Sequence, residues 1–493
     1  MKRNLSTILN SRIKSFEEIP GPFSIPILGT LYQYFPVIGR YKFDRLQRNG
    51  MEKYQRYGQI VREQIIPGIN LVWLFNPDDI QTIFRNEGKY PQRRSHLALK
   101  KYRLDRPMVY NTGGLLPTNG SDWLRLRSIF QKGLSSPKAV ENFLPISNQV
   151  VQEWVLIVKD LSKKESFDYL PQISRLFLEL TGVAAFDIRL DSFSKQELHP
   201  NSRSSKLIKA PYTSNSCILK LDNGPQLWKK FDTPLYKKFK KAQIFMEEVA
   251  IDLLSIKLSL FQENGPQTKS LLESYLSSPN LDFKDVIGFA CDFLLAGIDT
   301  STYTTSFILY HLAKNPQSQQ KLYEESLKLL PSPFSAVTKE ILSQAYYAKA
   351  VLKESLRLRP ISVGVGRILE KDTVLSGYNV PKETVIITQN QIACRLETNF
   401  PNPNDFIPER WIKEHEFYKP IHPFLVLPFG HGARSCIARR LAEQNMLIVI
   451  MKLIRCFEIG WSGPDLDTKS LLINKPDGSI TLTFKSRQGR KIE

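Results

Sequence analysis

One loop near the C-terminus limits the folds open to this chain more than any other feature. The stretch LPFGHGARSCIARR, residues 427–440, places a single cysteine, Cys436, after two glycines and between arginines. An apolar helical run follows from about Ile437, and both positive charge and the free N–H groups of a helix N-terminus stabilise a thiolate. The glycines allow the backbone to turn tightly and to approach a flat ligand closely. The loop therefore predicts a cysteine thiolate held against a planar ligand.

The other four cysteines do not share these surroundings. Cys217, Cys291, Cys394 and Cys456 are scattered and form no CxxC pair, which argues against a disulfide framework or a zinc cluster and favours a reducing compartment. A buried, inert thiol accounts for each of them, but it explains neither the glycines nor the arginines beside Cys436. A proximal thiolate ligand to haem iron explains both, because such a thiolate donates electron density that favours O–O bond cleavage. We therefore expect Cys436 to be a metal ligand.

The same loop carries a family resemblance. Phe429, Gly432, Arg434 and Cys436, read as F-x-x-G-x-R-x-C, resemble the haem-binding loop of the cytochromes P-450. The resemblance extends over residues 19–493. It implies the cytochrome P-450 fold, mainly α with a small β portion, as a single large domain around haem b. It also implies that Phe429 lies at the haem and that Arg434 meets a propionate, since a planar guanidinium suits a carboxylate.

One position departs from the family's pattern. The family usually has glycine two residues after the cysteine, and this chain has Ala438. Glycine at that position allows the following helix to pack closely on the haem. We expect the extra methyl group to shift this packing without abolishing ligation by Cys436.

A second motif lies on a long helix expected over residues 282–313. Residues 296–301, AGIDTS, are similar to the family's oxygen-activating motif. By this resemblance the two small residues that open the motif leave room for O2. Asp299 and Thr300 then form an acid–alcohol pair that delivers protons, which is general acid chemistry. The alternative is a Ser or Thr that caps the helix or bonds back to it, which suits Ser301 alone.

Four further positions are implied to hold the haem. Trp123 and Arg127 match the W-x-x-x-R helix whose side chains bond the propionates. Arg367 occupies another position that commonly binds a propionate, and His96 lies in a region where an Arg or His often does the same. A solvated basic residue is the alternative interpretation for each of these cations.

Three charged residues resemble the family's structural triad. Glu354 and Arg357 form its E-x-x-R pair, and side chains at this i, i+3 spacing can meet on a helix. Arg410, in the sequence PERW, completes the triad. Such pairs are common and weak on a surface, so the assignment depends on the resemblance. It implies a folding role for all three residues and no part in catalysis.

The rest of the chain predicts many helices and a few short strands. No run of about 18 or more apolar residues is present, so the sequence predicts no transmembrane helix. The Pro- and Gly-rich segment 19–30 is expected to be non-helical. Ser- and Lys-rich residues 197–241 are expected to form a solvated loop, with a peripheral membrane contact as the alternative. Helices are expected over residues 123–134, 145–161, 236–261, 282–313, 344–358 and 437–453, and short strands within 58–65, 70–75, 363–380 and 384–390.

The first sixteen residues, MKRNLSTILNSRIKSF, are basic, amphipathic and free of acidic residues. These features are typical of a mitochondrial transit peptide, and we expect residues 1–18 to be a targeting leader. A frayed basic terminus is the alternative. The whole chain has a formal net charge of +20, which favours anionic partners. Because no nucleic-acid-binding motif is present, we expect an acidic protein or a membrane surface rather than nucleic acid.

Four basic residues, together with the leader, indicate the mitochondrial branch of the family. Lys349 and Lys353 lie one turn apart before the E-x-x-R pair, and Arg439 and Arg440 follow the cysteine loop. They resemble the residues that mitochondrial members present to an acidic [2Fe–2S] ferredoxin, itself served by an NADPH-dependent reductase. Charge complementarity would make this encounter sensitive to salt. An ordinary solvated basic face is the alternative. The branch also implies peripheral contact with the inner mitochondrial membrane on the matrix side.

The resemblance also implies a substrate. Mitochondrial members typically oxidise sterols or secosteroids, and residues 223–239 and 432–446 most resemble the insect ecdysteroid 22-hydroxylases. This implies O2-dependent conversion of 2,22-dideoxyecdysone to 2-deoxyecdysone in moulting-hormone synthesis. Three alternatives stay open: hydroxylation of another sterol or position, rearrangement of a peroxide without external electrons, and a non-enzymatic haem sensor or carrier. The last two have no evident use for an acid–alcohol pair at Asp299 and Thr300.

Overall fold

The computed structural model of the protein describes residues 13–163, 167–264 and 270–487. Most of it is helical and a small part is in strands, which confirms the predicted fold class. The α-helices are α2 (Leu46–Tyr57), α3 (Pro77–Arg85), α4 (Leu97–Leu104), α5 (Gly120–Ser135), α6 (Pro137–Glu141), α7 (Leu144–Leu161), α8 (Leu170–Phe186), α9 (Arg203–Asn223), α10 (Pro234–Asn264), α11 (Leu271–Leu276), α12 (Phe283–Lys314), α13 (Pro316–Leu329), α14 (Lys339–Gln344), α15 (Tyr346–Leu358), α16 (Asn390–Ala393) and α17 (Arg439–Cys456). The 3-10 helices are η1 (Phe16–Glu18), η2 (Leu31–Tyr34), η3 (Gln226–Lys229), η4 (Pro408–Trp411) and η5 (Gly432–Arg434). The strands are β1 (Ile60–Glu63), β2 (Leu71–Leu74), β3 (Gly366–Ile368), β4 (Thr373–Leu375), β5 (Tyr378–Val380), β6 (Val385–Thr388), β7 (Phe457–Trp461), β8 (Thr468–Ser470), β9 (Asn474–Pro476) and β10 (Leu482–Ser486).

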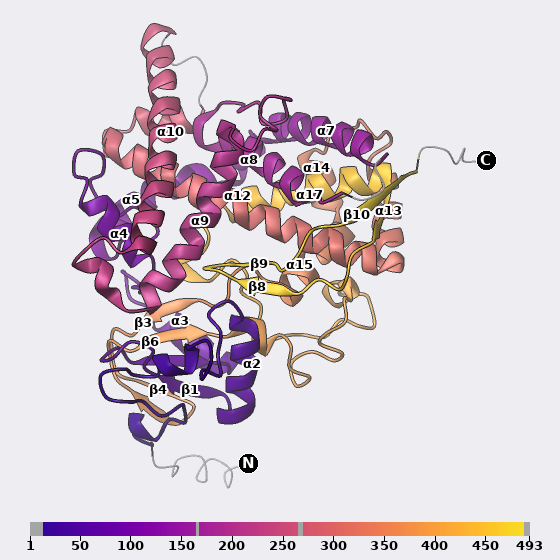
Figure 1. Ribbon diagram of the computed structural model, residues 1–493. Coiled ribbons are helices and arrows are strands. Elements are labelled where there is room, and N and C mark those ends of the chain that lie inside the picture. The colour runs from indigo at the N-terminus through magenta and orange to yellow at the C-terminus, as the bar shows by residue number, and fades with distance from the viewer. Residues whose placement is uncertain (1–12, 164–166, 265–269, 488–493) are drawn as a thin grey trace.

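The molecule has a larger helical part and a smaller part in which strands gather beside α2 and α3 (Figure 1). In the smaller part, four strands form one sheet in the order β1-β2-β6-β3. Strand β2 runs parallel to β6 with Leu71 opposite Val385, while β1 and β3 pair antiparallel with β2 and β6. The sheet thus joins the first hundred residues of the chain to its C-terminal third, which carries the cysteine loop.

Helix α12 runs through the helical part and carries the AGIDTS motif (Figure 1). Its N-terminus is fixed by a capping box. The Asp282 carboxylate accepts a backbone N–H bond from the first turn, and the Asp285 carboxylate accepts the N–H of Asp282. Pro316, at the start of α13, cannot continue the helix. The N-terminal half of α12 joins an apolar core with α5, α9 and α10, and the C-terminal half joins a second core with α7, α8 and α17. The motif lies where these two cores meet.

The prediction of a loop over residues 197–241 is wrong. This segment contains α9, η3 and the start of α10. In its apolar island, Cys217 and Ile218 are buried against α4, α10 and α12 rather than exposed to solvent or lipid. Leu207, Ala210 and Cys217 recur at helical spacing on the buried face of α9, while the exposed face carries Lys206, Lys209 and Lys220. The composition suggested a loop because Ser and Lys are common in loops, but this helical period decided the structure.

The predicted leader is only partly within the described residues, because residues 1–12 lie outside them. From Lys14 onward the chain belongs to the fold. The Lys14 N–H donates to the Gly377 carbonyl oxygen at 3.0 Å, and the Asn379 N–H donates to the Lys14 carbonyl oxygen at 2.9 Å, so this residue pairs with β5. Phe16 is buried in the apolar cluster beneath the sheet. The segment from Lys14 to Glu18 is therefore a structural part of the domain.

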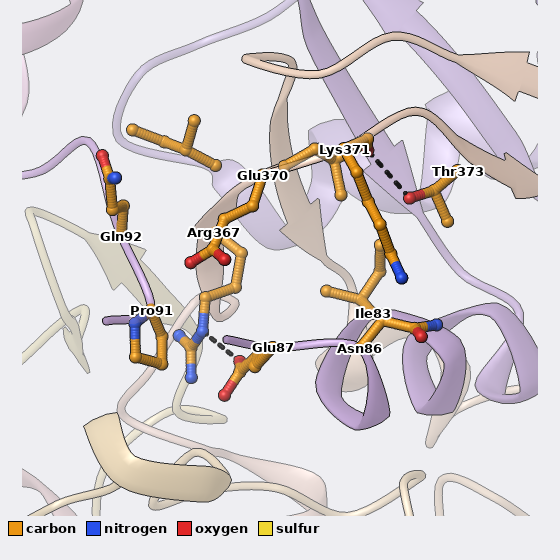
Figure 2. A pocket seen from close by; sticks show the side chains of 11 residues that line it. Ile83, Asn86, Glu87, Pro91, Gln92, Arg367, Glu370, Lys371 and Thr373 are labelled. Carbon is orange, nitrogen blue, oxygen red and sulfur yellow. Dashed lines mark hydrogen bonds and ion pairs between the residues drawn. The ribbon is translucent and has the colours of Figure 1, made fainter. Parts of the chain in front are cut away.

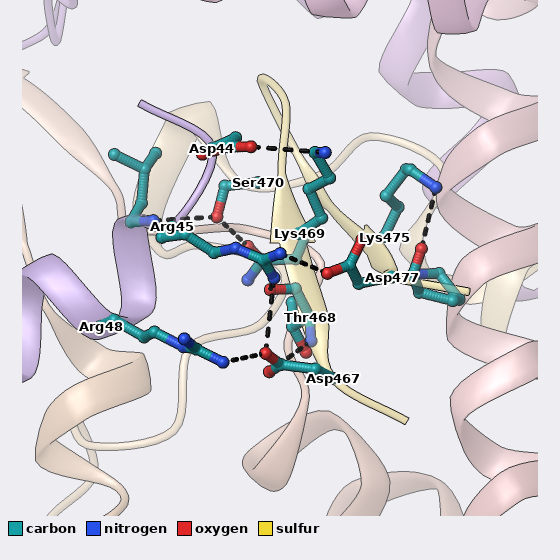
Figure 3. A network of polar contacts seen from close by, with 12 residues as sticks. Asp44, Arg45, Arg48, Asp467, Thr468, Lys469, Ser470, Lys475 and Asp477 are labelled. Carbon is teal, nitrogen blue, oxygen red and sulfur yellow. Dashed lines mark hydrogen bonds and ion pairs between the residues drawn. The ribbon is translucent and has the colours of Figure 1, made fainter. Parts of the chain in front are cut away.

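A polar network fixes the β8–β9 hairpin to α2 (Figure 3). Arg45 forms ion pairs with Asp467 and Asp477, and Arg48 forms one with Asp467. On the other side of the hairpin, the Lys469 ammonium lies 3.3 Å from a carboxylate oxygen of Asp44. Strand β9 in turn packs against α12, so this network holds the hairpin beside the AGIDTS motif.

Within the described part of the chain, no helix has both the length and the apolar character needed to cross a bilayer.

Candidate active site

The cysteine loop folds back on itself before α17. The Cys436 N–H donates to the Phe429 carbonyl oxygen at 2.8 Å, and the Gly430 N–H donates to the Leu427 carbonyl oxygen at 3.0 Å. Gly430 and Gly432 have φ angles of 71° and 70°, in the left-handed region that favours glycine. The two glycines therefore make the turns that present the Cys436 side chain at the edge of the loop.

Cys436 is the exposed member of the five cysteines, all of which are free. Burial nevertheless raises the pKa of its thiol, while a backbone N–H from Ala438 and the charge of Arg127 oppose the rise. The Cys436 side chain is thus accessible and yet densely surrounded by protein. Ala438, whose N–H donates to the Cys436 sulfur, is the N-cap residue of α17, which begins at Arg439 rather than at the expected Ile437. The thiol therefore lies at a helix N-terminus.

Arg434 points from the loop into the protein. Its Nε donates to the Pro91 carbonyl oxygen at 2.7 Å, and its Nη2 donates to the Thr118 carbonyl oxygen at 2.6 Å. The guanidinium carbon lies 4.1 Å from the centre of the Trp123 ring. The third nitrogen, Nη1, is buried and has no hydrogen-bond partner within the described protein. A buried donor without a partner costs about 1–3 kcal/mol, so Nη1 indicates an acceptor that the chain does not supply.

Arg434 belongs to a group of four arginines, here called the arginine cluster, that also contains Arg93, Arg127 and Arg367. Burial and the charges of other members lower the pKa of Arg93 to about 10 and that of Arg434 to about 9. Burial also lowers the pKa values of Arg127 and Arg367. In the described chain the one ion pair made by the cluster joins Arg367 to Glu87. The cluster thus carries an excess of positive charge that an anionic ligand would balance.

The arginine cluster and the thiol fit the carboxylates and the iron of haem b. The excess of buried guanidinium charge and the unpaired Nη1 of Arg434 match a group with two carboxylates, each able to accept paired N–H bonds. Arg127 and Cys436 are close enough that each charge shifts the pKa of the other, so the cluster adjoins the sulfur. The residues present therefore suit a planar cofactor with its carboxylates on the arginines and its metal at the cysteine.

Two of the predicted haem contacts have further partners in the protein. Arg367, on β3, directs its nitrogens toward Glu87 and two backbone carbonyl oxygens. His96 lies at the N-cap of α4 with a φ of 58°, and its Nδ1 is 2.5 Å from the Ser95 hydroxyl oxygen. Burial, together with the charges of Arg93 and Arg103, lowers the pKa of His96 to about 3. The imidazole is therefore neutral at physiological pH and adjoins the arginine cluster.

The AGIDTS motif interrupts the buried surface of α12. Ala296 is exposed, and Gly297 and Thr300 are half-buried. A Cβ atom added at Gly297 would lie 3.0 Å from Oγ1 of Thr181, so glycine at this position lets α8 and α12 pack closely. Ala296 is therefore the accessible small residue of the motif, whereas Gly297 serves the helix packing. The Thr300 hydroxyl donates to the Ala296 carbonyl oxygen at 2.6 Å, so the back-bonding expected only of Ser301 occurs at Thr300.

Asp299 is buried between α9 and α12. The Asn215 side-chain N–H donates to an Asp299 carboxylate oxygen at 3.3 Å. Burial raises the pKa of Asp299 to about 7, and the Asn215 amide, the Tyr303 hydroxyl and the charge of Lys475 oppose the rise. A carboxyl group with this pKa can gain and lose a proton near neutral pH, which an ordinary surface aspartate cannot. The side chains of Asp299 and Thr300 have separate hydrogen-bond partners in this structure.

The predicted structural triad forms a buried ion-pair cluster. Arg357 donates to both Glu354 carboxylate oxygens at 2.8 Å, and the Arg410 Nε lies 3.3 Å from one of them. The Trp411 indole N–H donates to the other at 3.0 Å. Further guanidinium N–H groups of Arg357 bond the carbonyl oxygens of Cys394 and other backbone groups. This cluster ties α15 to η4 and to the segment after α16.

The four predicted redox-partner residues differ in how free their charges are. Lys353 is exposed on α15, with its ammonium 5.8 Å from the centre of the Trp411 ring, and Arg440 is exposed at the start of α17. Arg439 is exposed but pairs with Glu443 at 3.1 Å. Lys349 is half-buried and donates to a backbone carbonyl oxygen at 2.9 Å. Lys353 and Arg440 are therefore the more available of the four cations.

The sequence alone does not single out two members of the site. Arg93 stands in the basic sequence QRRSH before α4, and its place beside His96 is the one signal that could have identified it. Glu87 has no such signal, because its partner Arg367 is 280 residues away in the sequence. Only the pairing of β3 into the sheet, next to the end of α3, brings the two together.

Comparisons with known proteins agree with this geometry. Residues 19–482 match the model of the family described as cytochrome P450. The chain is 48% identical over 478 residues to "Cytochrome P450 302a1, mitochondrial" of Drosophila melanogaster, with 96% of each protein covered. It is 30% identical to "Probable cytochrome P450 301a1, mitochondrial" of the same organism, with 94% of this chain and 86% of the relative covered. It is 28% identical to "Ecdysone 20-monooxygenase", also of that organism, with 97% of this chain and 90% of the relative covered. The chain therefore belongs to the cytochrome P450 family.

Proposed function

We propose that this protein is a mitochondrial haem-thiolate monooxygenase that hydroxylates a steroid, namely an ecdysteroid precursor at C-22. One observation carries the proposal: an accessible thiol, Cys436, lies at a helix N-terminus beside a buried cluster of arginines that has too few anions around it. This arrangement suits a thiolate-ligated metal in a group with carboxylates. A sensor or carrier would also need it, but would not need a titrating acid on α12.

The chain's own residues divide the work of holding haem b. Cys436 would ligate the metal, and Arg434, Arg127 and Trp123 would hold the carboxylates, with Phe429 packed at the loop. With a cysteine ligand, haem b supplies the activation of O2 that lets one oxygen atom enter a C–H bond. Arg93 and His96 would close the carboxylate end of the site, His96 as a neutral donor or acceptor.

Protons would come through the AGIDTS motif. Asp299 titrates near neutral pH, so it can take up a proton from the α9 side of the helix and release it again. Thr300, one residue further along, is half-buried, and its hydroxyl donates to the Ala296 carbonyl oxygen. Rotation of the Thr300 side chain away from this carbonyl oxygen would free the hydroxyl to pass on a proton.

Electrons would arrive from a [2Fe–2S] ferredoxin and its NADPH-dependent reductase. Lys353 and Arg440 offer free positive charge, and the names of two relatives describe them as mitochondrial. Lys353 lies over Trp411, which bonds the buried Glu354, while Arg439 lies 5.2 Å from the centre of the Phe429 ring in the cysteine loop. A docked acidic partner would therefore sit directly outside the loop.

The proposed location is the inner mitochondrial membrane, with peripheral contact on the matrix side. Cleavage of the leader would fall before Lys14, because removal of Lys14 to Glu18 would expose the end of β5 and the apolar cluster under Phe16. Six exposed apolar side chains in residues 23–38 favour the membrane contact: Phe23, Ile25, Ile27, Phe35, Val37 and Ile38. No acidic residue occurs between Ile19 and Phe43, so anionic lipid would meet no repulsion there.

The substrate proposal draws on two likenesses. Residues 223–239 and 432–446 resemble the ecdysteroid 22-hydroxylases, and one relative is named for monooxygenation of ecdysone. Both favour an ecdysteroid precursor, 2,22-dideoxyecdysone, with 2-deoxyecdysone as product.

Reconstitution tests this proposal. The purified holoenzyme is incubated with reduced ferredoxin, its reductase, O2 and a panel of ecdysteroid precursors, and the products are identified by mass spectrometry. We expect ferredoxin-dependent 22-hydroxylation by the wild type. In Thr300→Ala we expect O2 consumption to be poorly coupled to formation of the hydroxylated steroid. Turnover of a hydroperoxide without ferredoxin would instead indicate a peroxide-rearranging enzyme. Absence of steroid-dependent O2 consumption would indicate a sensor or carrier.

A further inference from the structure

We infer that Arg103, on α4, binds a ring ketone of the steroid substrate, and that Asp292, on α12, positions its guanidinium group. The inference rests on the proposed function and deepens it, because it names the chemical group that the protein would recognise on the substrate. It gives a role to a buried ion pair that neither the cysteine loop nor the AGIDTS motif uses.

Arg103 and Asp292 form this ion pair between α4 and α12, and both side chains are buried. The Arg103 Nη1 lies 2.8 Å from the Asp292 Oδ1 and donates to the Gly113 carbonyl oxygen at 2.9 Å. The Asp292 Oδ2 accepts the Leu115 N–H at 2.7 Å. A Cβ atom added at Gly114 would collide with the Arg103 Nη1 and would lie 2.7 Å from the Asp292 Oδ2. The loop after α4 therefore wraps tightly around the pair and holds the guanidinium in place.

One edge of the Arg103 guanidinium is left over. Its Nε and Nη2 are buried and have no hydrogen-bond partner within the described residues. Two other buried arginines use Nε within the protein: in Arg367 it pairs with Glu87 (Figure 2), and in Arg434 it donates to the Pro91 carbonyl oxygen. The N–H of Nε and one N–H of Nη2 point the same way and form a rigid fork. Arg103 therefore offers two donors to an acceptor that these residues do not supply.

The charge of the pair favours a neutral acceptor. Although burial lowers the pKa of Arg103, the charge of Asp292 raises it, so the guanidinium stays ionised beside its partner. A further anion would leave this buried group with an excess of negative charge, which is costly. A ketone oxygen accepts two hydrogen bonds and donates none, so it matches a fork of two donors, whereas a hydroxyl group brings a donor of its own. The pair thus differs from the arginine cluster, whose surplus charge suits carboxylates.

The position of the pair suits the ring end of a steroid. Asp292, Ala296 and Thr300 recur every four residues and therefore share one side of α12. The rise of a helix places Asp292 about 6 Å along the axis from Ala296 and about 12 Å from Thr300. Burial and nearby arginine charges, including that of Arg103, lower the pKa of His96, so Arg103 also adjoins the carboxylate end of the haem site. A steroid whose side chain reached Ala296 would extend its rings toward Arg103.

The test compares two ligands of the holoenzyme, 2,22-dideoxyecdysone, which has a ketone on ring B, and its analogue with a methylene group in place of that ketone. Dissociation constants are measured by equilibrium dialysis. We expect loss of the ketone to weaken binding to the wild type at least about tenfold, because the buried fork is left without an acceptor. Arg103→Lys keeps the charge beside Asp292 but loses the fork, so it should bind the two steroids within about threefold of each other.

Two further variants serve as controls. Arg106→Lys makes the same change in a neighbouring arginine, which is partly exposed and pairs with Glu247, and it should keep the preference of the wild type for the ketone. Arg103→Met combined with Asp292→Leu removes both charges of the buried pair together, an exchange that folded proteins often tolerate. It should lose the preference as Arg103→Lys does, and it decides the matter if Arg103→Lys does not fold.

Three results would overturn the inference. If Arg103→Lys weakens the binding of both steroids equally, or keeps the preference of the wild type, the pair has a purely structural role. If the wild type hydroxylates 2,22-dideoxyecdysone but binds both steroids equally, the inference fails while the proposed function stands. A wild type that binds neither steroid would overturn both.

Discussion

Two buried groups of charged residues, one around Glu354 and the other the arginine cluster, are built in opposite ways. Around Glu354, one carboxylate accepts bonds from Arg357, Arg410 and the Trp411 indole, and the remaining guanidinium groups bond backbone carbonyl oxygens. In the arginine cluster, four guanidinium groups share the charge of Glu87 alone among their ion-pair partners in the described chain.

The difference separates a folding role from a binding role. A buried charge group whose donors and acceptors are all matched is complete as it stands, and it holds the chain in one arrangement. A buried group with surplus charge, depressed arginine pKa values and an unpaired N–H is complete only with a ligand. The first group therefore belongs to the fold, and the second belongs to the site.

The largest expected effect comes from breaking the ion-pair cluster around Glu354. Glu354→Gln removes the shared carboxylate and leaves two buried arginines without a counter-charge, which costs about 3–5 kcal/mol. We expect a large drop in the urea midpoint or failure to fold. The exposed Glu416→Gln, a matched change in the same region, should stay within about 0.5 kcal/mol of the wild type. Similar stability of both variants would contradict a folding role for Glu354.

Asp299 extends the comparison to a buried carboxyl group that forms no ion pair with any residue the structure describes. Its pKa rises from about 3.9 in the unfolded chain to about 7 in the fold, so the folded state holds its proton more tightly. Stability should therefore fall as the pH rises from about 4 to about 7, by at most about 4 kcal/mol from this group. Asp299→Asn should remove this part of the slope and be more stable than the wild type at pH 8. Equal slopes in denaturant titrations of the two proteins would refute the raised pKa.

Arg434→Lys tests the binding role of the arginine cluster. The lysine keeps the charge but loses the fork that can hold a carboxylate, so one or more charge-assisted hydrogen bonds of about 1.5–3 kcal/mol are lost. We expect haem to be transferred to apomyoglobin about 10- to 100-fold more readily. Arg439→Lys, at the first residue of α17 but exposed and outside the cluster, should retain haem like the wild type. Equal retention in both variants would place the carboxylates elsewhere.

The smallest effect is expected where the charges are most exposed. Reversing Lys353 and Arg440 to Glu should raise the ferredoxin KM several-fold at low salt, less at high salt, and leave the steroid dissociation constant unchanged. Lys237→Glu with Lys238→Glu on α10 makes the same change in net charge on exposed residues elsewhere. The basic-face assignment fails if both pairs of reversals weaken ferredoxin coupling equally.

The sequence predicted elements and site residues that are set by local patterns. The long helix over residues 282–313 corresponds to α12, because its apolar pattern and its capping residues agree. The triad at Glu354, Arg357 and Arg410 could be predicted because the family resemblance ties together positions that are far apart in the sequence. Residues 197–241 were misassigned because their Ser- and Lys-rich composition masked the buried face of α9.

What could not be predicted depends on contacts between distant segments. The Gly297 side of α12 meets Thr181 of α8, which gives this glycine a packing role that the motif alone does not reveal. Glu87 meets Arg367 only because α3 ends next to β3. The burial that raises the pKa of Asp299 likewise requires α9 and the β8–β9 hairpin to be in place.

The most direct test of the account is the ferrous–CO spectrum of the purified holoenzyme and of two matched variants, Cys436→Ala and Cys456→Ala. Both changes remove a free thiol, but only Cys436 is exposed and adjoins the arginine cluster. We predict the thiolate-specific band in the wild type and in Cys456→Ala, and its loss in Cys436→Ala. An unchanged band in Cys436→Ala would contradict the assignment of Cys436 as the ligand, and with it the site described above.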